Sequence, residues 1–493
     1  MNDPTDITGL ANLITESVSS LVNICAANGF RIPRLEEGFT RESEAFRSNK
    51  DAAKAATVIA AAAFKLAAIL LPPEESIFQT ATGNLKSAAL QVAITCHVPE
   101  ILRDAGPQGL HSSDIAKKSG VDDMKLARLL RYLANRHIFR EVTPDVFTHN
   151  RISGVLDTGK SINDILRDPE SKHDGTNGFV ALVEHYLSEG HKGSAYLAEN
   201  MRDPKTSHSA EVNQAPLQRG LRTDLTYWEW YSQPEQLYHR RRFGIAMAGT
   251  LELEPPNFMA NVFDWKSLPA DSPIVDVGGG VGSSAMAILK AFPDLCAVVQ
   301  DLSVNTEQAI EFWKKEMPDA LDSQRIKLQG LYLSNIYWSL TDESRAVHDF
   351  FTPQPITNAS AFLLRLILHD WPDAQSVKIL THLRKAATPS TRLIILDSII
   401  PYTCDIPNAK FSEFETRSSG IPGLSLGAAN EMAFTNDISM MVWVNSQEHT
   451  LRQFRKLFEL SGWRLVNVTR NGNFLDCIEA LPSWYSTNSF YRL

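Results

Sequence analysis

The sequence predicts a doubly wound, mostly parallel α/β sheet preceded by a helical N-terminal domain. The main observation is a change of pattern at Pro273, after which short apolar runs alternate with segments of helical period. The second is a glycine-rich loop, residues 276–282, that follows the first of these runs. The third is a helix-turn-helix spacing over residues 109–136. A chain of 493 residues is long enough for two or three folding units.

The composition is ordinary for a globular protein, with 43% hydrophobic and 21% charged residues. A formal net charge of -9 argues against nucleic acid as a dominant partner. The five cysteines lie far apart without a CxxC pair, which suits a reducing cytoplasm and offers no metal site. The N-terminus MNDPTDITG has no positively charged region, so we expect no secretory signal.

Residues 1–75 are expected to form helices without catalytic groups. The segment Ala52–Glu75 is apolar enough to be considered as a membrane anchor, but Lys65 stands in its middle. A charge at the centre of a membrane span costs about 2.5–3.5 kcal/mol on insertion scales. We therefore interpret the segment as a helix packed against another helix, and we expect no membrane partner.

Residues 76–150 follow the pattern of a winged helix. Ser112–Asp114 can cap a first helix, Gly120 can end it, and a second helix is predicted from Asp122 to Arg136. The next stretch, FREVTPDVFTHN, resembles a wing.

This winged helix has two possible roles. The basic residues of its second helix could bind DNA: Lys125, Arg128, Arg131 and Arg136. Alternatively, the apolar residues of that helix form the core stripe of a scaffold: Met124, Leu126, Leu129, Leu130 and Leu133. The acidic chain favours the scaffold.

The C-terminal half alternates strands with helices. The expected strands are PIVDVGG, CAVVQDL, AFLLRLIL and RLIILDSII, and the expected helices include SSAMAILKAF, SVKILTHLRKAA and LRQFRKLFELSG. A polar stretch, residues 155–215, and an aromatic segment beginning TDLTYWEWYSQPEQ separate this half from the winged helix. Such alternation is typical of a doubly wound sheet.

The glycine loop predicts a nucleoside-containing cofactor. Gly278, Gly280 and Gly282 let the backbone turn sharply and approach a ligand at the N-terminus of the next helix. The following strand ends in Asp301, where an acidic residue can hydrogen-bond ribose hydroxyls. Nicotinamide dinucleotide and S-adenosylmethionine are both compatible with these residues. Further along, Asp349 and Phe350 suit the amino group and the face of an adenine.

The stretch LLRLILHDWPD, Leu363–Asp373, places a histidine at the end of a buried strand. Ligands bind outside the carboxyl ends of the strands in such sheets, so His369 should face the binding crevice. Asp370 stands two residues before Pro372, where it can serve either a turn or catalysis.

Together these motifs resemble a known family. The stretches DVGGGVG, QDL, VHDFFTP, LLRLILHDWPD, IILDSIIP and NSQEHT have the order and spacing of S-adenosylmethionine-dependent O-methyltransferases of the caffeic-acid type, and are most similar to its fungal branch. The resemblance covers about residues 76–480. It implies a Rossmann-like methyltransferase sheet and an all-helical, winged-helix-like N-terminal domain that forms a homodimer and closes over a phenolic substrate.

The resemblance also implies roles for individual residues. Those expected to bind S-adenosylmethionine are Asp276, Gly278, Gly280, Asp301, Leu302, Asp349, Phe350 and Arg365. Trp228 is expected near the sulfonium, and Met440 and Asn445 in the substrate pocket. We expect no metal ligands.

Methyl transfer to a phenol explains the need for His369. A phenol has a pKa of about 10 and attacks poorly until its proton is removed. An imidazole can take that proton, and an acid beside it can fix the tautomer. The family places acids at the positions of Asp397 and Glu448, with Glu more usual at the first. The sequence leaves open which of the two contacts the ring.

One stretch departs from the family pattern. Residues 330–347 stand where about one residue is usual, which makes about 17 additional residues beside the adenine pocket. A surface loop would cost little closure entropy. The alternative is an intron retained in the conceptual sequence over residues 331–346, which the transcript would decide.

Three domains are predicted: a helical extension over residues 1–75, a winged-helix-like dimerisation domain with its connector over 76–215, and a cofactor-binding catalytic domain over 216–493. The predicted function is O-methylation of a small aromatic metabolite in the cytoplasm. Two rivals are a non-methylating enzyme that uses the same cofactor electrostatically and a winged-helix DNA-binding regulator. The sequence does not name the acceptor, although the loop over residues 402–430 is expected to shape its pocket.

Overall fold

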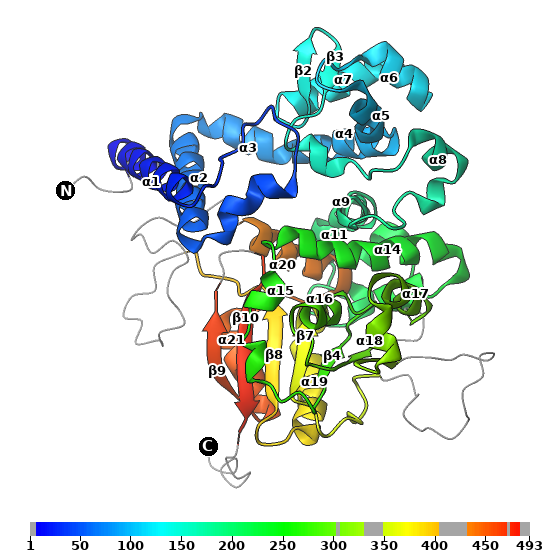
Figure 1. Ribbon diagram of the computed structural model, residues 1–493. Coiled ribbons are helices and arrows are strands. Elements are labelled where there is room, and N and C mark those ends of the chain that lie inside the picture. The colour runs from blue at the N-terminus through cyan, green and yellow to red at the C-terminus, as the bar shows by residue number, and fades with distance from the viewer. Residues whose placement is uncertain (1–5, 302–305, 330–348, 404–430, 471–473, 484–493) are drawn as a thin grey trace. The chain divides into compact units, whose positions relative to one another are not determined.

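The computed structural model describes residues 6–301, 306–329, 349–403, 431–470 and 474–483 (Figure 1). The chain divides into two compact units. The helical unit comprises the described residues up to His191 together with Glu235–Pro256. The sheet unit comprises Lys192–Pro234 and the described residues within Asn257–Ser418 and Met432–Leu493. Leu302, the insertion over residues 330–347 and nearly all of the loop over 402–430 lie outside the described residues.

The helical unit begins with two long helices, α1 (Ile7–Ala27) and α2 (Lys50–Leu70), which pack against each other. Leu10 of α1 is buried against Val58 of α2, as the interpretation of this segment as helix against helix requires. Both helices are long and apolar enough to cross a membrane by length and composition alone. Only 17% of the most apolar stretch of α1 and 22% of that of α2 is buried, so much of the apolar surface of these two helices faces outward.

The winged helix forms next, with its elements in the predicted order. They are α3 (Pro73–Ala81), α4 (Gly83–Thr95), α5 (Val98–Ala105), β1 (Leu110–His111), α6 (Ser112–Ser119), α7 (Asp123–Ala134), β2 (Arg140–Thr143) and β3 (Val146–Thr148). The three short strands form an antiparallel sheet in the order β1-β3-β2, so this mainly helical domain does include a wing. Gly120 ends α6 with a φ of 71°, as expected, whereas the side chain that caps its start belongs to His111.

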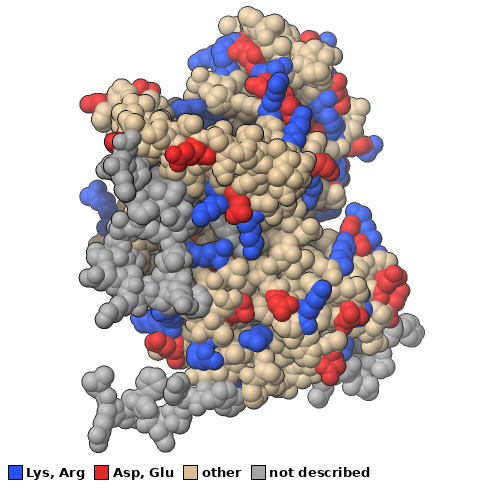
Figure 2. Space-filling view, turned by 60° about the vertical axis from the view of Figure 1, so that its left-hand side comes forward, with Lys and Arg blue, Asp and Glu red and all other residues tan. Residues whose placement is uncertain are grey.

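Helix α7 packs as a scaffold helix. Leu126, Leu130 and Leu133 are fully buried, while Leu129 packs against the same core from a partly buried position. The prediction for Met124 was wrong: its side chain is 75% exposed, because it lies in the first turn on the face opposite the buried leucines. Arg131, one of the four basic residues considered for DNA, forms ion pairs with Glu141 and Asp145. Lys and Arg side chains are interspersed with Asp and Glu on the face shown in Figure 2.

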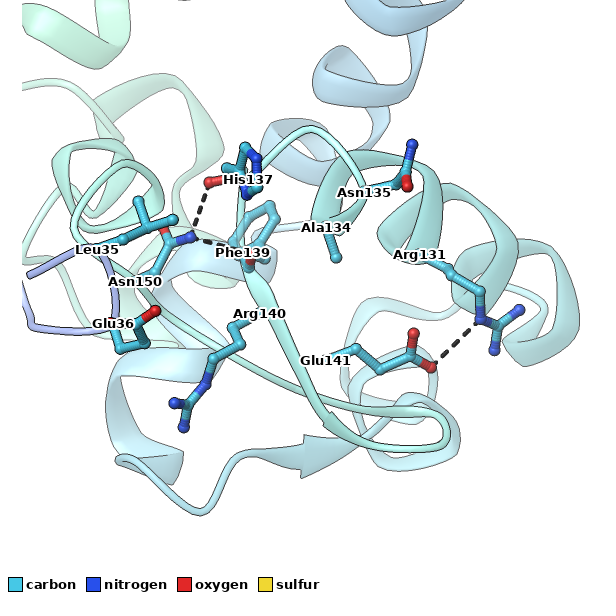
Figure 3. A pocket seen from close by; sticks show the side chains of 10 residues that line it. All are labelled: Leu35, Glu36, Arg131, Ala134, Asn135, His137, Phe139, Arg140, Glu141 and Asn150. Atoms are coloured by element: carbon cyan, nitrogen blue, oxygen red, sulfur yellow. Dashed lines mark hydrogen bonds and ion pairs between the residues drawn. The ribbon is translucent and has the colours of Figure 1, made fainter. Parts of the chain in front are cut away.

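A cavity of about 360 Å³ lies at the base of the wing (Figure 3). Groups of both charges line it together with Phe139 and Leu35, and none of its residues was predicted to bind a ligand. Asn150 braces one wall by donating to the carbonyls of His137 and Phe139 at 2.7 and 3.1 Å. These two carbonyls belong to residues with positive φ, 61° and 67°.

The remainder of the helical unit is built around two packed helices, α9 (Phe179–His185) and α14 (Leu237–Gly249). They approach so closely that a Cβ on Gly249 would lie 2.3 Å from the carbonyl carbon of Gly178. A π-helical turn, Tyr186–Gly190, continues α9 and buries Glu189. Arg242 forms an ion pair with Glu189, whose pKa falls to about 2 because ion pairing and hydrogen bonding outweigh the effect of burial.

The sheet unit contains a seven-stranded sheet in the order β6-β5-β4-β7-β8-β10-β9. Its strands are β4 (Ile274–Val277), β5 (Ala297–Gln300), β6 (Ile326–Gln329), β7 (Ala361–Arg365), β8 (Arg392–Asp397), β9 (Trp463–Thr469) and β10 (Asp476–Pro482). The first five in sequence are parallel, and β10 runs antiparallel to both of its neighbours. This is the predicted doubly wound, mostly parallel sheet.

The sheet unit also contains helices, several of which connect the strands. They are α11 (Leu197–Arg202), α12 (Pro216–Leu221), α13 (Tyr227–Tyr231), α15 (Phe258–Asn261), α16 (Ser283–Ala291), α17 (Thr306–Glu316), α18 (Pro318–Asp322), α19 (Asp373–Ala386), α20 (Glu431–Val444) and α21 (Leu451–Ser461). Helices α19 and α21 pack together and share one core with the sheet, in which Phe362 of β7 and Phe454 of α21 are fully buried.

The strand order changes direction between β4 and β7. From β4 the chain adds β5 and then β6 on one side, and β7 lies on the other side of β4. A crevice opens at such a point because the connections leave the sheet in opposite directions. The glycine loop after β4 and the turn after β7 therefore share this edge of the sheet.

Candidate active site

The loop between β4 and α16 is shaped by its glycines. Gly278, Gly280 and Gly282 have φ values of 70°, 58° and 81°, in the left-handed region that glycine tolerates best. A Cβ on Gly278 would lie 2.5 Å from Cδ1 of Ile367 and 3.6 Å from Cε1 of Phe350. No atom of the described residues lies within 4 Å of a Cβ added to Gly280, so that side of the loop is open among them.

Asp301 follows β5 and contacts the same loop. Its Oδ2 accepts a hydrogen bond from the backbone N–H of Gly280 at 2.7 Å. The backbone N–H of Asp301 donates to Gln329 at 3.3 Å, which continues the pairing between β5 and β6. A hydrogen bond thus joins the glycine loop to the residue after β5, the two segments that were predicted from the sequence to bind one ligand.

Asp276 lies beneath the loop with 1% of its surface exposed. Burial raises the pKa of its carboxyl to about 7, although a hydrogen bond from Ala285 and the charge of Arg365 oppose the shift. Its Oδ2 is buried without a hydrogen-bond partner among the described residues. A Cβ on Gly279 would lie 2.6 Å from this carboxyl group, so the loop closes tightly over it.

Phe350 and Asp349 reach the site differently. Phe350 is half-buried beside Gly278, and its ring packs edge-on against Trp371 with centroids 5.7 Å apart. Asp349 is exposed, and its carboxylate accepts the N–H of Phe351 at 2.9 Å within its own turn. The aromatic ring therefore belongs to the wall of the glycine loop, whereas the carboxylate lies at the surface.

The turn after β7 holds His369 in place. Leu366 has a φ of 56°, an uncommon conformation for a residue with a branched side chain. A short 3-10 turn, Leu368–Asp370, follows, and His369 is 5% exposed. The hydroxyl of Ser376 donates to the carbonyls of Leu368 and Trp371 at 3.2 and 3.0 Å. Strained backbone of this kind persists where the surroundings hold it and is concentrated at functional sites.

Glu448 is the acid that contacts the ring. The distance from His369 Nδ1 to Glu448 Oε1 is 2.5 Å, and His369 Nε2 lies 3.7 Å from Asp370 Oδ1. Asp397 at the end of β8 is fully buried, and neither of its carboxyl oxygens has a hydrogen-bond partner among the described residues. The sequence left open whether Asp397 or Glu448 contacts the ring of His369. In the structure the contact is made by Glu448.

The electrostatics of this cluster are dominated by burial and by mutual charges. Burial lowers the pKa of His369, but the charges of Glu448, Asp370 and Asp397 and the hydrogen bond to Glu448 outweigh it and raise the pKa to about 10. Burial raises the pKa of Asp370 to about 6 and that of Asp397 to about 8, although the charge of His369 opposes both shifts. Burial therefore favours the protonated form of Asp397, and the neighbouring acids favour the protonated form of His369.

Sequence reasoning missed two residues of α20 that hold Glu448. The side-chain amide of Asn436 donates to Glu448 Oε1, and Asp437 Oδ1 accepts the backbone N–H of Glu448 at 2.9 Å. Asn436 is 4% exposed. No motif marks either residue. The only signal is that both lie in the apolar helix that precedes NSQEHT.

The three residues predicted to contact substrate have different surroundings. Trp228 of α13 is half-buried and packs edge-on against Tyr227 with centroids 5.1 Å apart. Met440 is buried one helical turn after Asn436, on the same face of α20. The amide of Asn445 donates to the carbonyls of Ser209 and Glu211 at 2.8 and 3.0 Å, so only its oxygen remains for a ligand.

Two family models match the chain. The O-methyltransferase dimerisation domain matches residues 78–158, and the O-methyltransferase domain matches residues 232–326 and 341–464. The interruption between the last two ranges, residues 327–340, overlaps the insertion noted in the sequence over residues 330–340. Among the described residues, no group of three or more His, Cys, Asp or Glu side chains is arranged to hold a metal ion.

Known proteins are similar over most of their length. "4-O-methyltransferase 1" of Phanerochaete chrysosporium is 38% identical over 495 residues, which cover 97% of this chain and all of that protein. The structure titled "The structure of LepI complex with SAM" is similar with a TM-score of 0.65 and 19% identity, covering 86% of this chain and 93% of that one. A structure titled "A Pericyclic Reaction enzyme" has a TM-score of 0.64 and 18% identity, covering 87% and 94%. These structural matches show a shared Rossmann-like fold.

The family models match residues in both units. The Phanerochaete chrysosporium relative matches this chain over its whole length. The glycine loop, the acid after β5 and the histidine after β7 stand in the order expected of that family. The chain therefore belongs to the S-adenosylmethionine-dependent O-methyltransferases, with a dimerisation domain ahead of its methyltransferase domain.

Proposed function

We propose that this enzyme transfers the methyl group of S-adenosylmethionine to a phenolic hydroxyl of a small aromatic metabolite, with His369 as the general base. The observation that carries the proposal is the buried contact of 2.5 Å between His369 Nδ1 and Glu448 Oε1, just after β7 at the point where the strand order changes. The relative's name, which specifies methylation of an oxygen at position 4, supports a hydroxyl as the acceptor.

The contact with Glu448 assigns roles to the two ring nitrogens. An ionised carboxylate can only accept hydrogen bonds, so Nδ1 carries a proton and its N–H donates a hydrogen bond to Glu448. Nε2 is then the nitrogen that takes the phenol's proton. Glu448 stabilises the imidazolium that results, as the acid of a catalytic triad does. Asp370 Oδ1, 3.7 Å from Nε2, adds to this stabilisation and lies where it can also orient the acceptor.

The acids around His369 outweigh the effect of its burial and raise its pKa to about 10. A more basic imidazole takes the proton of a weakly acidic phenol more readily. The same pKa keeps most of the imidazole protonated at pH 7, so the rate should rise with pH. Bound S-adenosylmethionine supplies the methyl group and a positive charge, and a positive charge nearby lowers the pKa of an imidazole.

The residues of the glycine loop fit this cofactor. The loop is open at Gly280, and the buried Oδ2 of Asp276 lacks a partner among the described residues. Carboxylate oxygens beside an open backbone loop suit a ligand that carries hydroxyl and amino groups. We assign the ribose to Asp301, the adenine to Phe350 and Asp349, and the loop itself to Asp276, Gly278 and Gly280, with Arg365 beside them. Leu302, assigned to the same pocket, lies outside the described residues.

We propose that the homodimer forms through residues before about 150, in the cytoplasm. Large apolar side chains are exposed along α1, α2 and α3: Val18, Val22, Phe64, Ile69, Leu70, Ile77 and Phe78. The last of these begins the match to the dimerisation domain, so this apolar surface is continuous with the segment that the family uses for dimers. Helices with this many large exposed apolar side chains favour an interaction site.

Methyl transfer is tested by incubating the protein with cofactor carrying a labelled methyl group and a panel of flavonoids, hydroxybenzoates and aromatic polyketides. Label on a phenolic oxygen, with one S-adenosylhomocysteine formed for each methyl group, is the expected result. Conversion of an acceptor without S-adenosylhomocysteine would favour the non-methylating rival. The same fold occurs in a structure titled as a pericyclic enzyme, so this readout is needed beside the fold.

A further inference from the structure

Glu448 Oε1 receives two hydrogen-bond donors. One is His369 Nδ1 at 2.5 Å, and the other is the side-chain amide of Asn436. The two donor atoms are 3.4 Å apart, so they converge on the same oxygen. The proposed function uses the first donor and leaves the second without a role.

The orientation of the Asn436 amide follows from the chemistry of its neighbour. An ionised carboxylate offers only acceptors, so the NH2 of the amide must face it and the carbonyl oxygen must face away. The backbone of Glu448 is fixed as well, because its N–H donates to Asp437 on the same helix. Consecutive residues of α20 thus hold Glu448 at its carboxylate and at its backbone.

We propose that Asn436 is a positioning residue for the base: its amide shares Glu448 Oε1 with the imidazole and limits how firmly that carboxylate holds the proton on His369. This inference rests on the proposed role of His369 and extends it to a residue that no motif marks.

The physical reason lies in the charges that face the imidazole. They are Glu448 from the loop before α21, Asp370 from the turn after β7 and Asp397 from the end of β8, and Asp437 of α20 faces Glu448. Together the first three raise the pKa of His369 to about 10 against the effect of burial. A neutral donor on Oε1 stabilises the carboxylate in its own right, so the imidazolium gains less from it. Without the amide, the proton should be held more firmly.

The test measures the pKa of His369 directly in Asn436→Leu and Asn436→Ala. Leu has nearly the volume of Asn and no donor, and Ala guards against a clash that prevents folding. Histidines labelled at Cε1 are followed by NMR in the full-length protein, and His369→Gln identifies the resonance. We expect the pKa of His369 to rise by about one unit, and the acidic limb of the kcat profile to move by a similar amount with little change in KM.

If Asn436 had a purely structural role, the pKa of His369 would shift in the opposite direction. If the amide only kept Glu448 in place, its loss would free the carboxylate from the ring, and the pKa of His369 would fall toward its ordinary value of about 6.5. An unchanged or lowered pKa in both variants would therefore overturn the proposal. Asn436→Gln, which keeps the donor, should restore a profile close to that of the wild type.

Asn467→Leu is the matched control. Asn467 donates to Glu479 Oε1 at 2.7 Å between β9 and β10, so this variant removes the same kind of bond elsewhere in the sheet unit. It should leave the pKa of His369 unchanged. The NMR measurement does not depend on turnover. The proposed function and the proposed role of Asn436 can therefore be contradicted independently of each other. A raised pKa in a protein that methylates no phenol removes the proposed function alone, whereas methylation with an unchanged pKa removes the role of Asn436 alone.

Discussion

Gly278 and Ile367 lie in direct contact across the edge of the sheet, so that a Cβ on the glycine would stand 2.5 Å from the Ile367 Cδ1 atom. Gly278 belongs to the loop after β4, and Ile367 stands two residues before His369 in the turn after β7. This contact therefore links the proposed cofactor loop to the proposed base. A change at either position should be felt at the other.

Gly278→Ala should weaken S-adenosylmethionine binding. The left-handed backbone costs a non-glycine residue about 1–2 kcal/mol, and the added methyl group also pushes against Ile367. Calorimetry should give a lower affinity, and Ile367→Val, which removes Cδ1, should recover part of it in the double variant. Gly159→Ala is the control, because Gly159 has a similar φ of 75° and no atom of the part of the chain that the structure describes lies within 4 Å of the added Cβ. Equal affinities for Gly278→Ala and the wild type would contradict the assignment of this loop.

Asp397→Asn should make the protein more stable at alkaline pH. Burial raises the pKa of Asp397 to about 8 in the folded protein, whereas an unfolded aspartate has a pKa of about 3.9. Between pH values of about 3.9 and about 8 the folded state thus keeps a proton that the unfolded chain has released, so stability falls as the pH rises across this range and levels off above about 8. Asparagine resembles the protonated acid and cannot ionise, so this loss disappears.

Thermal unfolding at a series of pH values checks this prediction. The variant and the wild type should have similar midpoints near about pH 4, and the advantage of the variant should grow between about pH 4 and about pH 8 and stay constant above it. Asp294→Asn, at an exposed position, should follow the wild type throughout. A difference that does not grow with pH would mean that Asp397 is already ionised in the folded protein.

The features that were predicted best from the sequence depend on a single strand and the turn that follows it. The apolar run of β7 is buried on both faces as predicted, and His369 lies in the turn just after it. The contact of Glu448 with the ring could not be predicted, since it depends on how α20 and the following loop return to the sheet. Asn436 was missed for the same reason. The prediction for Met124 was wrong because the helical period places this residue on the face opposite the buried leucines.

Leu70→Asp combined with Phe78→Asp should separate the homodimer into monomers. Both side chains are large and exposed, at 62% and 67%, and an aspartate in an apolar interface loses its hydration without a partner. Light scattering should give twice the chain mass for the wild type at micromolar concentration and the single chain mass for the variant. Leu460→Asp, an equally exposed leucine of α21, should remain dimeric. A wild type of single chain mass would refute the dimer itself.

His369→Ala should abolish most methyl transfer while leaving cofactor affinity nearly intact. The imidazole acts on the acceptor's hydroxyl, so its loss falls on the chemical step, to which general-base catalysis contributes about 10²–10⁴-fold. Residual activity should rise with pH, because the phenolate then forms without help and positioning alone remains. His382→Ala, in the neighbouring α19, is the control and should keep its activity.

Glu448→Gln separates the role of the acid from that of the base. Removing the charge that contributes most to raising the pKa of His369 should move the acidic limb of the rate profile to lower pH. The maximal rate should fall at the same time, because the imidazolium formed in the reaction loses its partner. Asp397→Asn should affect the rate less, since burial favours the neutral form of its carboxyl group and this group makes no hydrogen bond to the ring among the described residues. If His369→Ala kept wild-type turnover at pH 7 on a phenol of ordinary pKa, both roles would be wrong, and the rate would have to come from positioning the two reactants alone.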